Sequence, residues 1–294
     1  MFKPLFQSFI LFSVGYLTST QSLASISPEE KALNTSLKTL TIKQANKARI
    51  DEIKAKNQPI KATEHNITSP IIISPFKAEY SIIHKSKKAG NGLRQLEKLA
   101  DNTYRYSYTT DIEWLIFDDK RSEESIITLT NNRVIPTHYK YIREGTGRDK
   151  FYEWSYDVNN KTAKNIKDDK TITVEFPDNI QDSLSYHLQH RINLIKNPTQ
   201  QSYRYSVIKS SGDIREYVYE YVGEEELMLP YGLVKAIKLK REVTKKEKVT
   251  YAWFAPSLNY LLVRLYQSKG GTEQFEAQLT AFESDDDNAN SNQK

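Results

Sequence analysis

The chain has no cysteine among its 294 residues. This absence excludes disulfide bonds, thiolate metal sites, a cysteine nucleophile and the lipid-modified cysteine of a bacterial lipoprotein. The sequence also lacks a Gly-x-Ser-x-Gly elbow, a phosphate-cradling glycine loop and a dinucleotide-binding fingerprint. We therefore predict no cofactor and no metal, and we expect the fold to be held by its core.

The sequence has no concentrated block of basic charge. The net charge is +5, and the 42 Lys and Arg residues are interspersed with 37 Asp and Glu residues. A nucleic-acid footprint would need basic residues gathered on one face. We predict an ordinary solvated surface and no nucleic-acid partner.

Long hydrophobic runs are also scarce. One apolar stretch, from Phe9 to Leu17, follows Lys3, and Ser22-Leu23-Ala24 supplies small residues where a signal peptidase reads them. The stretch is shorter than the roughly 20 residues of a membrane-spanning helix, and no later segment is apolar enough to cross a bilayer. We predict that residues 1–24 are a cleaved signal peptide and that the mature chain is periplasmic or secreted. An uncleaved anchor helix is the alternative.

The rest of the chain divides by composition. Residues 25–72 are polar and lysine-rich, and they predict a linker that is partly helical or disordered, with a helix start at Ser27-Pro28-Glu29-Glu30. Residues 73–284 are long enough for one β domain with a continuous core. Residues 285–294 predict a disordered acidic tail.

Tyrosine is abundant and recurs at every second position. The clearest runs are Tyr104, Tyr106 and Tyr108, and Tyr217, Tyr219 and Tyr221. A period of two places these side chains on one face of an extended strand, so the pattern predicts an all-β, mainly antiparallel protein.

Short extended segments separated by turn residues predict a meander. The expected strands are at 76–84, 93–99, 103–110, 122–130, 133–143, 150–157, 161–166, 170–176, 201–208, 213–222, 232–243, 247–254, 260–268 and 272–282. The expected turns are at Gly90-Asn91-Gly92, Asn131-Asn132, Gly145-Thr146-Gly147, Asn159-Asn160 and Gly270-Gly271.

One segment has helical spacing instead. Ile180, Leu184, Leu188, Ile192 and Ile195 predict an amphipathic helix at 178–197, with Asp178 as its cap. Its single apolar stripe would pack on the concave side of the sheet. Because an open meander exposes two edges, we expect the sheet to curve into a barrel or half-barrel.

Four blocks resemble one protein family. The run from Tyr251 to Leu265 is similar to the carboxy-terminal signature of the domain of unknown function 3108 family, a set of exported bacterial proteins. Three further blocks match in the same order: Phe76-Lys77-Ala78-Glu79-Tyr80, Val134 to Tyr141, and Gln181 to Tyr186. Leu262 departs from the family, which often has proline there. The resemblance implies export and a β architecture, but no active site.

The candidate chemical residues each have a structural alternative. His187 and His190 have the spacing of two metal ligands, but a third ligand is not visible, so we interpret them as the polar edge of the helix. Ser183 and Ser185 lack a nucleophile elbow. Pairs of acids occur at Asp118-Asp119, Glu123-Glu124 and Asp168-Asp169 and in the run Glu224 to Glu226. Because neighbouring strand residues point to opposite faces, none of these pairs converges by itself. Most lie beside predicted turns, so we interpret them as solvated acids.

Aromatic faces are the better ligand-binding candidates. Tyrosine suits core packing, the lining of a lipid cavity or stacking on sugars. Trp114, Trp154 and Trp253 are expected to anchor the core, and Arg264 is expected to pair with an acid. The candidate ligand-binding residues are Tyr104, Tyr106, Tyr108, Tyr217, Tyr219, Tyr221, Trp253 and Arg264.

The sequence leaves three functions open. The first is a non-catalytic envelope protein that binds a lipid or other amphiphile in its concave face. The second is a structural or interaction protein that holds a partner protein or glycan through exposed tyrosine faces. The third is a cell-wall hydrolase that uses scattered acids, with Asp182 and His187 as its most plausible pair.

Overall fold

The computed structural model describes residues 44, 70–114, 117–166 and 173–285. The predicted signal peptide, nearly all of the predicted linker and the predicted acidic tail after Asp285 lie outside these residues. For Trp114 the structure describes the backbone but not the side chain.

The fourteen strands of the described residues form one sheet. They are β1 Phe76–His84, β2 Lys87–Ala100, β3 Thr103–Trp114, β4 Phe117–Thr130, β5 Arg133–Gly145, β6 Lys150–Asp157, β7 Thr162–Asn165, β8 Thr173–Glu175, β9 Ser202–Ile208, β10 Ile214–Leu229, β11 Gly232–Val243, β12 Lys248–Ala255, β13 Leu261–Lys269 and β14 Thr272–Ser284. The helix α2 spans Ser185–Lys196, and two short 3-10 turns, η2 Thr244–Lys246 and η3 Pro256–Leu258, precede β12 and β13.

The sheet is a meander joined to itself at its middle. Its order runs β8 to β1 and then β14 to β9, and all its strand pairs are antiparallel. Within the described residues β8 and β9 remain as its two edges, so the sheet curves without closing. This arrangement confirms the predicted all-β fold and, of the two predicted shapes, shows the half-barrel and not the closed barrel.

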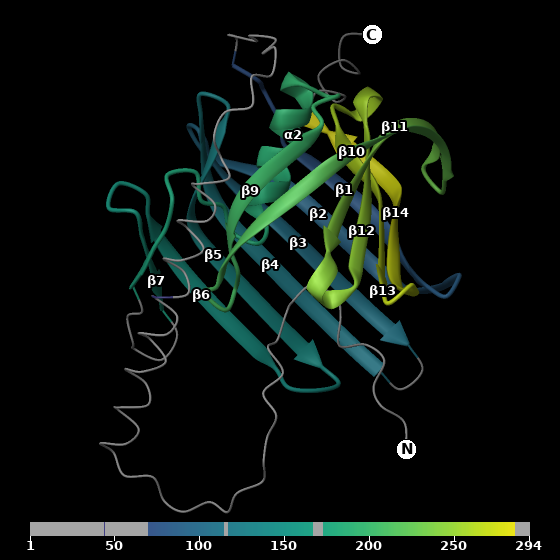
Figure 1. Cartoon of the computed structure of the whole chain (residues 1–294), viewed down its shortest axis with the longest axis horizontal. Helices are drawn as coiled ribbons and strands as arrows, with labels where there is room; N and C mark the ends of the chain where they lie inside the picture. Colours follow the sequence, from purple (N-terminus) through teal and green to yellow (C-terminus); the bar gives the residue numbers. More distant parts are fainter. Residues whose placement is uncertain (1–43, 45–69, 115–116, 167–172, 286–294) are drawn as a thin grey trace, which may run out of the picture.

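The helix α2 connects the two edges, because it follows β8 and precedes β9 in the chain. In Figure 1 it lies between the long strands β2 to β5 and the green strands β9 and β10. The curved sheet therefore encloses α2 in its interior.

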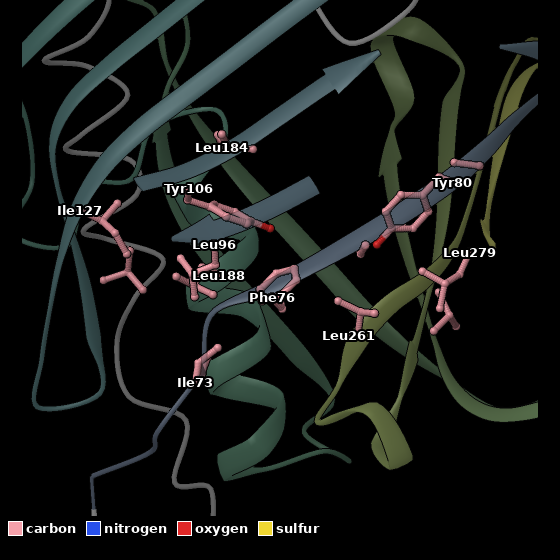
Figure 2. Close-up of a cluster of buried hydrophobic side chains, with 14 of the residues drawn as sticks. Ile73, Phe76, Tyr80, Leu96, Tyr106, Ile127, Leu184, Leu188, Leu261 and Leu279 are labelled. Atoms are coloured by element: carbon pink, nitrogen blue, oxygen red, sulfur yellow. The ribbon is translucent and has the colours of Figure 1, made fainter. Parts of the chain in front are cut away.

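Both faces of α2 are buried, which corrects the prediction of one apolar stripe. Leu184 and Leu188 pack against Tyr106 and Phe76 in the main core, as Figure 2 shows. On the opposite face Leu194 belongs to a second core cluster built by β9 to β13. The helix thus fills the space between the two halves of the sheet.

The start of the helix also differs from the prediction. Asp178 lies in a turn, and the segment that follows pairs with β9, where the Gln181 amide donates to the Ser206 carbonyl at 2.9 Å. The helix begins at Ser185, where Asp182 Oδ1 accepts hydrogen bonds from the amides of Leu184 and Ser185 at 2.8 and 2.6 Å. Asp182 therefore satisfies the amides of Leu184, just before α2, and of Ser185, its first residue.

Most predicted strands and turns are confirmed, and β1, β6 and β11 have the predicted bounds. The turn predicted at Gly90-Asn91-Gly92 is wrong, because these residues lie inside β2 and the turn is at Lys85 and Ser86, both with positive φ. Gly90 is needed for a close approach instead: a Cβ there would lie 2.1 Å from the Asp111 carbonyl oxygen. Strand β10 also continues past the predicted end through a bulge near Gly223.

Candidate functional site inside the half-barrel

A layer of polar side chains crosses the interior next to α2. The inward positions of β2, β3, β4 and β5 contribute Arg94, Tyr108, Glu123 and Tyr139, because alternate residues of each strand face inward. The segment before α2 and the helix itself add Asp182, Ser183 and His187.

Part of this layer surrounds a small cavity of about 30 Å³. This volume has room for on the order of one or two water molecules. Its polar lining is Arg94, Tyr108, Glu123, Ser183 and His187, and its remaining lining is Tyr80, Leu184, Leu262, Leu265 and Ala277. The cavity thus has the mixed apolar and polar lining of a ligand site but only the volume of bound water.

Arg94 is the cation of this cavity and is only 6% exposed. Its guanidinium carbon lies 5.0 Å from the ring centroid of Tyr108 and 5.8 Å from that of Tyr106. Among the described residues no carboxylate oxygen lies within 4 Å of its nitrogens, and its Nε has no hydrogen-bond partner. The charge therefore lies against aromatic rings and the hydroxyl of Tyr106, and not in an ion pair.

Glu123 is the acid of the cavity and is 5% exposed. Tyr139 donates to its Oε2 at 3.0 Å. Burial raises the pKa of Glu123 to about 7, and the nearby Asp182 adds to the rise. Near neutral pH this carboxyl is therefore partly protonated.

Asp182 and His187 do not form a catalytic pair. Asp182 accepts a hydrogen bond from Ser125 Oγ at 2.5 Å in addition to its bonds with α2, and burial raises its pKa. Burial, with a contribution from Arg94, lowers the pKa of His187 well below its ordinary value. In the part of the chain that the structure describes, no hydrogen bond joins Asp182 to His187, so the hydrolase pair is not assembled.

The two histidines of α2 do not make a metal site. His190 contacts the hydroxyl of Tyr205 through Nδ1 at 2.7 Å and lies among aromatic rings, whereas His187 faces the cavity. Across residues 70–114, 117–166 and 173–285 no group of three or more His, Cys, Asp or Glu side chains is placed to hold a metal ion.

The predicted tyrosine residues face inward. Tyr106 is buried, and Tyr104 and Tyr108 are partly buried against the main core. Tyr217 and Tyr219 are buried in the second cluster. Tyr221 is partly buried against the same cluster. The hypothesis of a partner held by exposed tyrosine faces therefore does not apply to Tyr217 and Tyr219, since curvature of the sheet puts that face inside.

Trp253 and Arg264 lie together but do not line the cavity. The Arg264 guanidinium carbon lies 4.6 Å from the Trp253 ring centroid, and Arg264 Nε donates to Glu276 Oε1 at 2.6 Å. The predicted ion pair of Arg264 is confirmed. Trp154 and Trp253 are buried, as expected of core residues.

The sequence pattern did not identify Arg94 as a site residue and assigned Glu123 to the solvated surface. Glu123 was expected to be solvated, but it lies opposite Tyr108 in the strand register and so shares the inward face. The signal that could have found it is the alternation of β4, in which Ser125 and Ile127 share its face. Asp119 is buried for the same reason.

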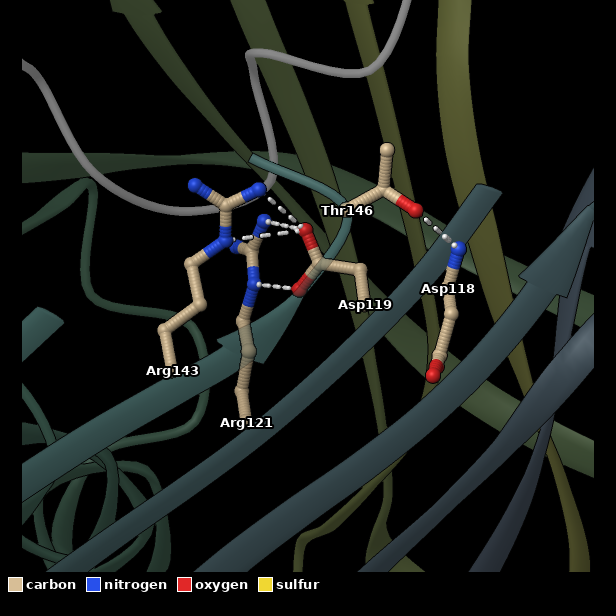
Figure 3. Close-up of polar contacts among 5 residues, drawn as sticks. All are labelled: Asp118, Asp119, Arg121, Arg143 and Thr146. Atoms are coloured by element: carbon tan, nitrogen blue, oxygen red, sulfur yellow. Dashed lines mark hydrogen bonds and ion pairs between the residues drawn. The ribbon is translucent and has the colours of Figure 1, made fainter. Parts of the chain in front are cut away.

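A second polar group, formed by Asp119, Arg121 and Arg143, shows inward-facing arginines that are paired with a carboxylate. In Figure 3 Arg121 and Arg143 both contact Asp119, with a distance of 2.6 Å from Arg121 Nε to Oδ1 and 2.8 Å from Arg143 Nη2 to Oδ2. Although burial opposes the shift, the two arginines hold the pKa of Asp119 below its ordinary value. Each arginine of this group contacts a carboxylate, unlike Arg94.

A larger hollow lies on the outer face of β1 to β5 and measures about 460 Å³. Its lining includes solvated ion pairs such as Lys77 with Glu79 and Lys120 with Asp111. Exposed pairs of this kind contribute little energy. The smaller interior cavity, with its unpaired buried atoms, is therefore the better candidate site.

The fold and the interior site define an open β half-barrel with an enclosed helix. The chain belongs to the family described as "Protein of unknown function (DUF3108)", whose sequence model matches residues 79–278. This confirms the resemblance seen in the sequence. No curated protein matches the chain.

Solved structures with low sequence identity are similar to parts of the chain. A β-barrel-like protein of domain of unknown function DUF1849 from Brucella abortus is 10% identical, with a TM-score of 0.48, covering 73% of this chain and 99% of that one. A DUF1089 family protein from Pseudomonas aeruginosa is 10% identical, with a TM-score of 0.33, covering 73% and 97%. A candidate exported protein with a YmcC-like fold from Bacteroides fragilis is 13% identical, with a TM-score of 0.29, covering 73% and 98%.

None of the helices in the described residues combines the length and the apolar character that crossing a membrane requires.

Proposed function

We propose that this protein is a non-catalytic exported binding protein that takes an amphiphile into its half-barrel beside α2. The observation that carries the proposal is the interior cavity, in which two buried polar atoms, Arg94 Nε and Ser183 Oγ, have no hydrogen-bond partner. An unsatisfied buried polar group costs about 1–3 kcal/mol. A ligand that pairs with these atoms would recover that cost.

The cavity of about 30 Å³ is too small for an alkyl chain, so α2 must shift when the ligand enters. Such a shift would repack the side chains of α2 against both core clusters and leave the strand pairing of the sheet in place. The segment before α2 is joined to β9 by two backbone hydrogen bonds, from the Gln181 amide to the Ser206 carbonyl and from the Ile208 amide to the Gln181 carbonyl. The helix can therefore move without separating any pair of long strands.

Fluorescent fatty-acid uptake by the delipidated protein tests the proposal. We expect saturable binding that unlabelled fatty acid displaces. Ala277→Val places two extra methyl groups at the wall of the cavity and should weaken uptake at least fivefold. Ala281→Val, on the same strand but outside the cavity, is the matched control.

Two results would contradict the proposal. One is the absence of binding to the wild-type protein. The other is equal uptake by Ala277→Val, Ala281→Val and wild type, since the ligand would then lie elsewhere.

Export is the second part of the proposal, and it rests on the pattern of residues 1–24. We expect the protein in the periplasmic or secreted fraction, with Ser25 as its first residue by amino-terminal sequencing. A mature chain that begins at Met1 would contradict cleavage.

A further inference from the structure

We propose that Arg94, assisted by Ser183, binds the carboxylate headgroup of a fatty-acid-like amphiphile, an inference that rests on the proposed function and specifies its ligand. The chain of the ligand would lie against Leu184, Leu262 and Leu265. The site is defined by side chains that come from β2, the segment before α2, α2 itself and β13.

Within the described residues Arg94 differs from Arg121 and Arg191, which both pair through Nε, although Nη1 of Arg191 has no hydrogen-bond partner. Arg121 shares Asp119 with Arg143, and Arg191 donates from Nε to the Asn259 carbonyl at 2.6 Å. Arg94 has no such carbonyl or carboxylate at its Nε, although it is 6% exposed. Because arginine stays protonated, its charge cannot be relieved by losing a proton.

A carboxylate fits the groups that surround Arg94. The planar guanidinium donates two parallel hydrogen bonds to a carboxylate, and such bonds are stronger when the site excludes water. Ser183 Oγ lies in the same cavity without a partner and can supply a further donor. The Tyr80 hydroxyl is already engaged, since it donates to the Leu262 carbonyl at 2.7 Å.

The acid in the cavity does not fill this role. Glu123 is engaged by Tyr139, and among the described residues its carboxylate is not within ion-pair distance of Arg94. Burial raises the pKa of Glu123 to about 7, so its negative charge is reduced near neutral pH. The acid of the cavity therefore does not neutralise the charge of Arg94, and a bound anion would.

The apolar side of the cavity sets the class of ligand. Leu184, Leu262 and Ala277 are buried, and Leu265 is partly buried. A small free anion would leave this wall without a partner, whereas the first carbons of an alkyl chain would cover it. The combination of one cation and an apolar wall favours an amphiphile with a compact anionic head.

The test compares two ligands with the same chain, a fluorescent polyene fatty acid and its methyl ester. Wild-type protein should bind the acid at least tenfold more tightly than the ester. Arg94→Met, which keeps the length of the side chain but removes the charge, should lose this preference while retaining ester binding. Arg105→Met, on the outward face of β3, is the matched control and should keep the preference.

The outcomes separate the two proposals. Binding of neither ligand would contradict the proposed function itself. Equal binding of acid and ester by wild type, with no effect of Arg94→Met, would overturn only the headgroup assignment. Tighter binding of a phosphate-headed lysolipid than of the fatty acid would overturn the choice of carboxylate.

Folding of the variant is checked by circular dichroism and by thermal unfolding. If Arg94→Met does not fold, Arg94→Lys retains the charge but not the planar fork, and it should reduce the acid preference of wild type severalfold. An unchanged preference in Arg94→Lys would contradict bidentate recognition.

Discussion

Replacing Glu123 with glutamine should remove a pH-dependent penalty on folding. The side chain is buried, and its pKa is raised from 4.5 to about 7. In the unfolded chain the same carboxyl ionises near its ordinary value. Between these two values the folded state binds more protons than the unfolded state, so stability decreases as pH rises.

The size of the effect follows from the shift. Each pKa unit corresponds to about 1.4 kcal/mol, so a rise from 4.5 to about 7 amounts to about 3 kcal/mol once the pH exceeds 7. Glutamine retains an oxygen that can accept the hydrogen bond from Tyr139 but carries no charge. The variant should therefore gain about 1 kcal/mol relative to wild type at pH 5 and about 3 kcal/mol at pH 8.

Urea unfolding at pH 5, 6, 7 and 8 measures this difference. Glu124→Gln is the control, because Glu124 is next in the chain but points outward and pairs with Arg105. Its curve should run parallel to that of wild type. The reasoning is refuted if the gain of Glu123→Gln is constant across this range or shrinks as pH rises.

Substitutions at Leu188, Gly90 and Asp182 test the fold by the same unfolding assay. Leu188→Ala on α2 should lower the free energy of unfolding by about 2–5 kcal/mol. Leu233→Ala, at a site 64% exposed, is the control and should change it by less than about 0.5 kcal/mol. Similar losses for the two variants would contradict burial of α2. Gly90→Ala should lower the free energy of unfolding by about 2–3 kcal/mol, because its Cβ would collide with the Asp111 carbonyl. An unchanged free energy would contradict the close approach of the two backbones. Asp182→Ala should cost about 2 kcal/mol and Asp182→Asn about half of that at pH 6, while equal costs would contradict its capping role.

The alternation of side chains was enough to predict the strands, because half-buried strands repeat every two residues. It could not say which way a face points. Tyr217 and Tyr219 are inward because the whole sheet curves, and curvature depends on strand pairing across the chain, such as β1 with β14. Gly90 was interpreted as a turn because glycine serves both turns and close approaches.

The helix was predicted from spacing, but its surroundings were not. A stripe of Leu184 and Leu188 predicts one buried face, whereas α2 is enclosed by two halves of the sheet. Arg94 carried no sequence signal, because the residues near α2 and on β13 that complete its cavity are distant in the chain. Glu123 and Arg94 became candidates only when the strand register placed both beside α2.

The most direct measurement is a crystal structure of the protein grown with a fatty acid that carries bromine on its chain. We predict an anomalous bromine peak inside the half-barrel beside Leu262 and Leu265, with the carboxylate within hydrogen-bond distance of Arg94. A bromine peak only on the outer face of the sheet, with the interior cavity unchanged, would contradict binding beside α2.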